Sequence, residues 1–367
     1  MIKKFADVLE IRNGKNQKAV ENPHGKYPIY GSGGLIGFAD DYICEANTVI
    51  IGRKGSINNP IFVEVPFWNV DTAFGLVADE RQILPQYLYY FCKHYNFEKH
   101  NKAVTIPSLT KTDLLEIQID IPDLNRQLDV IEKLQKIEAI VGIREQQLNK
   151  LNELIKARFV EMFGDPISNN FGWKQVLLRE VTSKIGSGAT PRGGKESYQT
   201  EGITFIRSMN VHDGRFEYKD LAHITDEQAT QLNNVIVKEG DVFINITGAS
   251  VARSCIVPSN ALPARVNQHV AIIRCIYGRL HPVFVNYMFL NDRFKRHLLD
   301  IGDSGGATRQ AITKQQLENL VVILPPMILQ HKFATFVAQI DKSKVAVQKS
   351  LDKTQQLFDS LMQKYFG

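Results

Sequence analysis

Two loops combine cationic, amide and hydroxyl side chains directly after a β-branched, apolar run. Residues 52–58 read Gly-Arg-Lys-Gly-Ser-Ile-Asn, and residues 245–253 read Asn-Ile-Thr-Gly-Ala-Ser-Val-Ala-Arg. Exposed side chains of these types on a strand-ending loop can contact phosphates and the base edges of a duplex. From either loop alone, an ordinary hairpin with a solvated tip is the favoured explanation. The recurrence of the loop in both halves of the chain raises nucleic-acid binding to an equal alternative.

Three further polar stretches extend this chemistry. Residues 68–72 and 265–269 carry Asn, Gln and Arg, which can pair bidentately with adenine and guanine, although a polar entry to a core strand fits them as well. Residues 102–110 and 305–313 end in Thr110 and Thr313, which are predicted helix N-caps. The glycine-rich cationic loop 185–195 lacks the GxxxxGK[ST] and GxGxxG patterns of nucleotide-binding loops. We therefore expect it to lie against a DNA backbone or to be a plain turn.

The candidate DNA-binding side chains are drawn from these four kinds of stretch and from Arg207. They are Arg53, Lys54, Ser56, Asn58, Asn69, Thr72, Lys102, Thr105, Arg192, Lys195, Arg207, Asn245, Thr247, Arg253, Asn267, Gln268, His269, Thr308, Arg309 and Gln310. Arg309 is the leading candidate in its stretch.

The sequence offers no catalytic constellation. Residues 59–62, Asn-Pro-Ile-Phe, approach the NPP[YF] loop of amino-methyltransferases, but the second proline and a preceding glycine-rich S-adenosylmethionine loop are missing. Nucleophile-elbow, zinc and helicase motifs are absent, and the four cysteines and nine histidines have no metal-ligand spacing. We expect no catalysis by this chain alone and no bound metal.

Composition sets the frame for these sites. The 367 residues allow two or three domains, and 44% hydrophobic and 23% charged residues are ordinary for a globular protein. A net charge of +5 permits nucleic-acid binding through local patches without demanding it. No apolar run is long enough to span a membrane, and the first residues lack an apolar signal core, so the default compartment is the cytoplasm.

Two long helices must position these loops. Residues 122–164 and 325–367 match at one constant offset, the distance from Gly164 to Gly367. Each has apolar residues at steps of mostly three and four, a proline before it and a glycine after it. A helix of about 40 residues is roughly 60 Å long and needs a partner of similar length. The other copy is the obvious partner, although two unrelated coiled-coil linkers remain an alternative.

The chain order predicts four parts: a globular segment at 1–121, a helix at 122–164, a second globular segment at 165–324 and a helix at 325–367. If the helices pair along their length, they run antiparallel with one globular segment at each end, related by a pseudo-twofold axis. Short β-rich runs, including residues 27–30, 48–51 and 74–77 in the first segment and 241–246 and 269–274 in the second, predict strands. Helical runs follow them in both segments, which predicts a mixed α/β (α+β) fold. The scaffold repeats while the loops differ, which suggests one binding task performed on two targets.

The chain resembles a known family in several places. Thr308-Arg-Gln-Ala-Ile-Thr-Lys314 has a counterpart at residues 105–111, a strand ends in Pro-Pro, and Gln127 and Gln330 open the two helices. With the ending of the first helix at residues 156–166, these features resemble the specificity subunit of type I restriction–modification systems.

The resemblance implies two domains that each recognise half of a split double-stranded DNA target, with the helices as a ruler between the halves. It also implies two methyltransferase subunits that carry S-adenosylmethionine and methylate adenine at N6. Restriction subunits using ATP and Mg would join them in a prokaryotic cytoplasm, with no cofactor in this chain. The main alternative is a coiled-coil scaffold whose end domains bind protein or carbohydrate. A stand-alone methyltransferase or nuclease is disfavoured by the missing motifs.

Overall fold

The structure is a computed structural model that describes residues 1–101, 107–303 and 310–367. The chain divides into two compact units. Unit 1 comprises Met1–Gln146 and Val347–Gly367, and unit 2 comprises Gln147–Ala346. Each unit therefore contains part of both long helices, whereas the chain-order division at 121, 164 and 324 stays a prediction.

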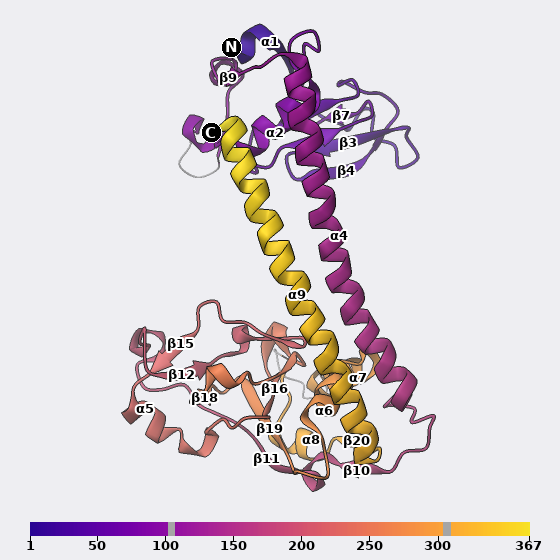
Figure 1. Ribbon diagram of the computed structural model, residues 1–367, viewed down its shortest axis with the longest axis vertical. Helices are drawn as coiled ribbons and strands as arrows, with labels where there is room; N and C mark the ends of the chain where they lie inside the picture. Colours follow the sequence, from indigo (N-terminus) through magenta and orange to yellow (C-terminus); the bar gives the residue numbers. More distant parts are fainter. Residues whose placement is uncertain (102–106, 304–309) are drawn as a thin grey trace. The chain divides into compact units, whose positions relative to one another are not determined.

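The two long helices are α4 (Leu124–Phe163) and α9 (Met327–Phe366), drawn in magenta and yellow in Figure 1. Each has 40 residues, as the repeated pattern predicted. The first ends at Gly164, whose φ of +72° suits a residue without a β-carbon and whose amide donates to Val160 O at 2.8 Å.

Within unit 1 the two helices run antiparallel. The Arg126 guanidinium near the start of α4 lies 5.9 Å from the ring centroid of Tyr365, near the end of α9. Further along, Lys93 Nζ binds Glu138 Oε1 of α4 at 2.6 Å and lies 5.3 Å from the ring of Phe358 in α9. Advancing along α4 therefore means going back along α9.

Unit 2 repeats this antiparallel pairing with the other halves of the helices. Arg158 of α4 lies 5.8 Å from the ring of Phe336, and Phe163 lies 5.5 Å from Phe333, nearer the start of α9. The apolar stripe predicted from sequence provides these contacts, since Phe159 and Phe163 are buried in the core of unit 2.

The described strands in the globular part of unit 1 form three sheets. The strand orders are β2-β8-β5-β6, β4-β3-β7 and β1-β9, and β3 and β7 are parallel neighbours. The strands are β1 (Ile2–Lys4), β2 (Leu9–Asn13), β3 (Tyr27–Gly31), β4 (Gly34–Ala39), β5 (Thr48–Gly52), β6 (Ile61–Val63), β7 (Trp68–Asn69), β8 (Ala73–Ala78) and β9 (Gln118–Asp120). Its short helices are α1 (Phe5–Val8), α2 (Pro85–His94) and α3 (Lys111–Leu115).

The globular part of unit 2 has the same plan with additions. The matching strand orders are β11-β19-β16-β17, β15-β12-β18 and β10-β20, and β12 and β18 are again parallel. The strands are β10 (Gln175–Leu177), β11 (Thr182–Ser187), β12 (Ile203–Ile206), β13 (Val211–His212), β14 (Arg215–Phe216), β15 (Ala222–Ile224), β16 (Val242–Asn245), β17 (Ser254–Ile256), β18 (Ala264–Val266), β19 (Val270–Cys275) and β20 (Val321–Ile323). Its helices are α5 (Asp226–Gln231), α6 (Pro282–Phe289), α7 (Asp292–Asp303) and α8 (Lys314–Glu318). The β13–β14 hairpin lies inside an excursion between β12 and β15, where unit 1 has a tight turn.

A buried glutamine joins each long helix to its globular part. In unit 1, Gln127 Oε1 accepts from Leu84 N at 2.8 Å, and Gln127 Nε2 donates to Pro122 O at 2.9 Å. In unit 2, Gln330 Oε1 accepts from His281 N at 2.8 Å, and its Nε2 donates to Pro325 O at 2.8 Å. Each glutamine connects the residue before a short helix with the proline before a long helix.

Most sequence-predicted elements are confirmed. The strands expected near residues 27–30, 48–51, 74–77, 241–246 and 269–274 are β3, β5, β8, β16 and β19. Thr110 and Thr313 are N-caps, since their side chains accept from Asp113 N and Gln316 N. None of the helices in the described part of the chain is long and apolar enough to cross a membrane.

Candidate nucleic-acid interface

Four segments of unit 1 meet where their strands end. The loop after β5 is held to the turn before β8 by Arg53 N, which donates to Thr72 O at 2.8 Å. The same loop is held to the segment before α3, because Leu109 N donates to Arg53 O at 2.9 Å and Gly55 N to Pro107 O at 3.1 Å. The fourth segment is the end of β3, which contacts the turn before β8.

Unit 2 repeats these bonds position by position. Ile246 N donates to His269 O at 2.9 Å, Ile312 N to Ile246 O at 2.8 Å, and Gly248 N to Gln310 O at 3.0 Å. The isolated bridge Lys54–Ser108 of unit 1 likewise corresponds to Thr247–Ala311. The end of β12 takes the place of the end of β3, since Asn267 N donates to Ile206 O as Val70 N does to Tyr30 O, both at 3.0 Å. The backbone frame is therefore the same in the two units.

In unit 2 this frame encloses a groove of about 650 Å³. The groove is lined by residues from all four segments. They are Ser208, Met209, Thr247, Gly248, Ala249, Ser250, Arg253, His269, Gln310 and Ala311. Four of the candidates picked from the sequence, Thr247, Arg253, His269 and Gln310, thus come from three distant parts of the chain to one surface.

The groove presents a mixed set of hydrogen-bonding groups. Arg253 is half-buried and supplies a planar donor fork, and Gln310 supplies an amide that can both donate and accept. The Thr247 hydroxyl is hydrogen-bonded to His269 Nδ1, which fixes the orientation of both side chains. Such a set suits a planar partner with donors and acceptors along its edge, as base pairs have.

The same frame in unit 1 presents different side chains. Arg53, Lys54 and Ser56 are exposed on the loop after β5, and Thr72 is half-buried beside them. The Arg53 guanidinium lies 5.7 Å from the ring centroid of Phe74, a residue of β8. This surface carries two cations, Arg53 and Lys54, where the unit 2 groove offers hydroxyl, imidazole and amide groups beside the single cation Arg253.

Three candidate asparagines are buried rather than exposed. Asn69 and Asn245 are 0% exposed and Asn267 is 6% exposed. Their amides serve the backbone: Asn69 Nδ2 donates to Ala73 O at 3.1 Å, Asn245 Nδ2 to Ser208 O at 2.9 Å, and Asn267 Oδ1 accepts from His269 N at 3.0 Å. The exposure expected of Asn245 on a strand-ending loop is wrong, because the residue closes β16 and its side chain turns inward. These amides hold the backbone of the frame by hydrogen bonds.

Asn58 is a fourth candidate that is engaged within the protein. Its side chain is exposed, but Asn58 Oδ1 accepts from Phe97 N at 2.7 Å and Asn58 Nδ2 donates to Asn96 Oδ1 at 3.2 Å. It ties the loop after β5 to the segment after α2.

The remaining described candidates lie on exposed or half-buried surfaces of unit 2. Arg192 and Lys195 are exposed on the loop after β11, and Gln268 is exposed next to it, where its Oε1 accepts from Thr190 Oγ1 at 2.5 Å. Arg207, at the end of β12, lies 5.4 Å from the ring centroid of Tyr198. Lys102, Thr105, Thr308 and Arg309 fall outside the described residues.

Two groove residues were not predicted from the sequence. Ser208 and Met209 line the groove from the end of β12, and Met209 is exposed. The sequence places them far from the other lining residues, and only the parallel pairing of β12 with β18 brings them close. The neighbouring Arg207 was the available signal.

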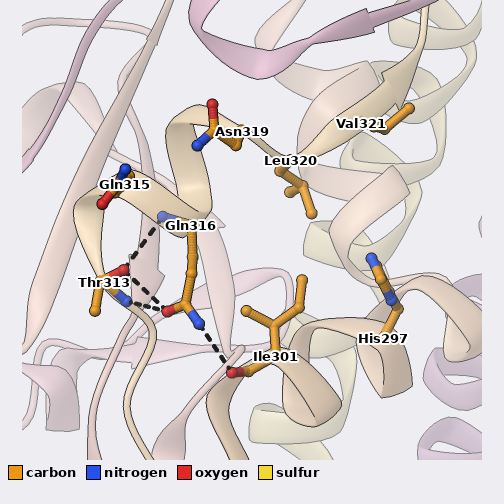
Figure 2. Close-up of a pocket in the computed structure, with 8 residues that line it drawn as sticks. All are labelled: His297, Ile301, Thr313, Gln315, Gln316, Asn319, Leu320 and Val321. Atoms are coloured by element: carbon orange, nitrogen blue, oxygen red, sulfur yellow. Dashed lines mark hydrogen bonds between the residues drawn. The ribbon is translucent and has the colours of Figure 1, made fainter. Parts of the chain in front are cut away.

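A second cavity of unit 2, of about 370 Å³, lies between α7, α8 and β20 (Figure 2). Its polar groups serve the fold, because Gln316 Oε1 accepts from Thr313 N at 2.8 Å and Gln316 Nε2 donates to Ile301 O at 3.3 Å. None of the sequence-predicted DNA-binding residues lines it.

The cysteines show no sign of reactive chemistry. Burial raises the pKa of the Cys44, Cys255 and Cys275 thiols to about 12, and that of Cys92 further. The thiols are therefore protonated at neutral pH and are poor nucleophiles.

Known proteins share this architecture. A crystal structure of a type I restriction–modification system S subunit from M. genitalium superposes with a TM-score of 0.62 at 15% identity, covering 100% of this chain and 96% of that one. At such identity the likeness shows the fold alone.

Two relatives in sequence are named as specificity subunits of type I restriction enzymes. The putative type I restriction enzyme MjaX specificity subunit of Methanocaldococcus jannaschii is 23% identical over 309 residues, covering 77% of this chain and 69% of its own length. The type I restriction enzyme EcoBI specificity subunit of Escherichia coli is 21% identical over 374 residues, covering 93% of this chain and 77% of its own.

A family model matches most of the sequence in two stretches, residues 1–153 and 170–357, one for each repeat of the frame. Its description is the type I restriction modification DNA specificity domain. The chain belongs to that family.

Proposed function

We propose that this chain is the sequence-specificity subunit of a type I restriction–modification complex and reads a two-part target in duplex DNA, one part with each unit. One observation carries the proposal. The same four-segment backbone frame occurs in both units, held by matched hydrogen bonds, and it presents different side chains in each. A shared frame with different groups at its surface is what two readers of two sequences require.

The proposal assigns the chemistry of modification to partner subunits. Two methyltransferase subunits would bring S-adenosylmethionine and methylate adenine at N6, and restriction subunits would bring ATP and Mg. This chain would supply recognition and no catalysis, in keeping with its missing motifs and its protonated thiols.

The direct test is methylome sequencing of a host that carries this chain with its methyltransferase subunits. We expect N6-methyladenine in a single two-part motif with a fixed gap, and none when the chain is left out. Methylation without any motif, or a motif that persists without this chain, would refute the proposal.

A binding assay separates DNA recognition from a scaffold that binds protein or carbohydrate. Counterion release makes the logarithm of the affinity for duplex DNA fall linearly with the logarithm of salt concentration.

A methyl-transfer assay tests whether this chain is itself a methyltransferase. Purified chain incubated with DNA and labelled S-adenosylmethionine should transfer no methyl group, and robust transfer would place catalysis in this chain.

A further inference from the structure

The β3–β4 hairpin of unit 1 exposes apolar side chains beside the cationic loop. Leu35 is 54% exposed and Ile36 is 55% exposed. Ile36 is an extra residue in β4, since Ile29 pairs with Gly37 and Tyr30 with Leu35, so the regular alternation of side chains is interrupted here. More than half of each side chain is nevertheless left uncovered by the described part of the chain.

The tip of this hairpin is unusually thin. Residues 31–34 read Gly-Ser-Gly-Gly, with Ser32 and Gly33 forming the turn between Gly31 and Gly34. Gly34 has a φ of +122°, which other residues adopt only with strain. A β-carbon on Gly33, in contrast, would meet nothing within 4 Å. The hairpin end is therefore two backbone strands wide.

The tip lies at the candidate interface. A methyl group on Gly55 would lie 3.8 Å from Ser32 Oγ, and one on Gly31 would lie 3.9 Å from Thr72 Oγ1. Gly55 follows the exposed Arg53 and Lys54, so the tip and the cationic loop share one edge of unit 1 (Figure 1 labels β3, β4 and β7 together).

Charge distinguishes the two ends of the hairpin. Asp40 and Asp41 follow β4 at the end away from the tip, where Asp40 binds Asn22. The tip end has Arg53 and Lys54, with Asp71 as a carboxylate beside Thr72. A polyanion would accordingly meet the tip end of the hairpin first.

We propose that the β3–β4 hairpin enters the major groove of DNA as a two-stranded ribbon, and that Leu35 and Ile36 are specificity-determining residues that touch base edges. The inference rests on the proposed function. The major groove is about 12 Å wide and admits a two-stranded β-ribbon. Strands lie about 4.8 Å apart, and glycines at the tip add no width. Apolar side chains on such a ribbon contact thymine methyl groups, while Arg53 and Lys54 neutralise phosphates.

The two units would therefore read DNA by different means. In unit 2 the corresponding β12 leads into the longer excursion that places Ser208 and Met209 in the groove. In unit 1, β3 leads instead into the short turn of the β3–β4 hairpin.

The test compares variants in the complex with the methyltransferase subunits. Leu35→Ser with Ile36→Ser removes the apolar contacts, and Gly33→Glu adds charge and bulk at the tip where the fold has room. Val65 is 50% exposed and follows β6 near the start of β5, away from the tip, so Val65→Ser and Val65→Glu are the matched controls. Thermal unfolding verifies that each variant folds.

We expect the double serine variant to bind the wild-type target about tenfold more weakly and to relax one half of the methylated motif only. Gly33→Glu should weaken binding at least as much, and both Val65 controls should match the wild type. An unchanged motif and affinity in both tip variants would overturn this inference and leave the proposed function intact. Loss of the methyltransferase subunits from the purified complex would also overturn it, by identifying a protein-docking surface. A wild-type complex without any two-part motif would overturn both.

Discussion

Replacing the buried Gln127 by leucine should destabilise unit 1 selectively. Gln127 is 0% exposed, and its side chain makes three hydrogen bonds, to Leu84 N at 2.8 Å, Gln82 O at 2.9 Å and Pro122 O at 2.9 Å. Leucine has a similar size but neither donates nor accepts, so the loss is one of hydrogen bonding rather than of volume.

The expected cost follows from those three groups. About 1 kcal/mol for each of the two hydrogen bonds that Nε2 donates, with about 1–3 kcal/mol for the stranded Leu84 amide, gives about 3–5 kcal/mol. A unit of this size loses about 2–4 °C in melting temperature per kcal/mol, so unit 1 should melt about 6–20 °C lower. Gln330→Leu should cost unit 2 somewhat less, because two hydrogen bonds of its side chain are seen in the structure.

The two tryptophans make the assay specific to each unit. Trp68 lies in unit 1 and Trp173 in unit 2. Unfolding of Gln127→Leu is followed by fluorescence in a Trp173→Phe background, which reports unit 1, and in a Trp68→Phe background, which reports unit 2. The control is Gln135→Leu, an exposed glutamine on the same helix that should leave both transitions unchanged.

Two outcomes of the Gln127→Leu experiment would contradict this prediction. If Gln127→Leu matched the control within about 0.5 kcal/mol, the hydrogen-bonded glutamine would not be what joins α4 to its globular part. If both tryptophans reported the same loss, the effect would not be confined to unit 1.

Two further predictions concern unit 2. Arg253→Ala should cost about 1–3 kcal/mol of binding free energy for one half of the target, and Arg253→Lys should restore little of it, because lysine lacks the planar donor fork; titration against DNA with either half scrambled measures this. Burial, and secondarily His331, lower the pKa of His281, whose Nδ1 accepts from Val283 N at 3.1 Å. The unfolded chain, with a histidine pKa of about 6.5, then binds more protons than the folded chain, so the free energy of unfolding of unit 2 should fall as the pH drops below about 6.5. His281→Asn keeps an N-cap acceptor and should flatten that dependence; a wild-type stability that does not change between pH 7.5 and 5 would contradict it.

The two long helices could be predicted from the sequence alone. Their periodic apolar residues and their flanking proline and glycine depend on neighbours within a few positions, so local pattern was enough to place α4 and α9. The same holds for the N-caps Thr110 and Thr313, whose hydrogen bonds close within three residues.

The hairpin β3–β4 shows where local pattern fails. The run at 27–30 predicted one strand, but four residues rich in glycine hid the tight turn that leads into β4. Glycine permits many conformations, so the turn is decided by pairing across the hairpin and not by the glycines themselves.

The sequence by itself determined the duplication, the paired helices and the polar loops that recur at matching places. Tertiary structure alone decided which of those polar side chains are available to a ligand. Asn245 and Thr247 are two residues apart, yet the first is buried against Ser208 O and the second faces the groove with His269. An amide can satisfy a buried backbone group as well as it can meet a base edge, and only the packing of distant segments determines which it does.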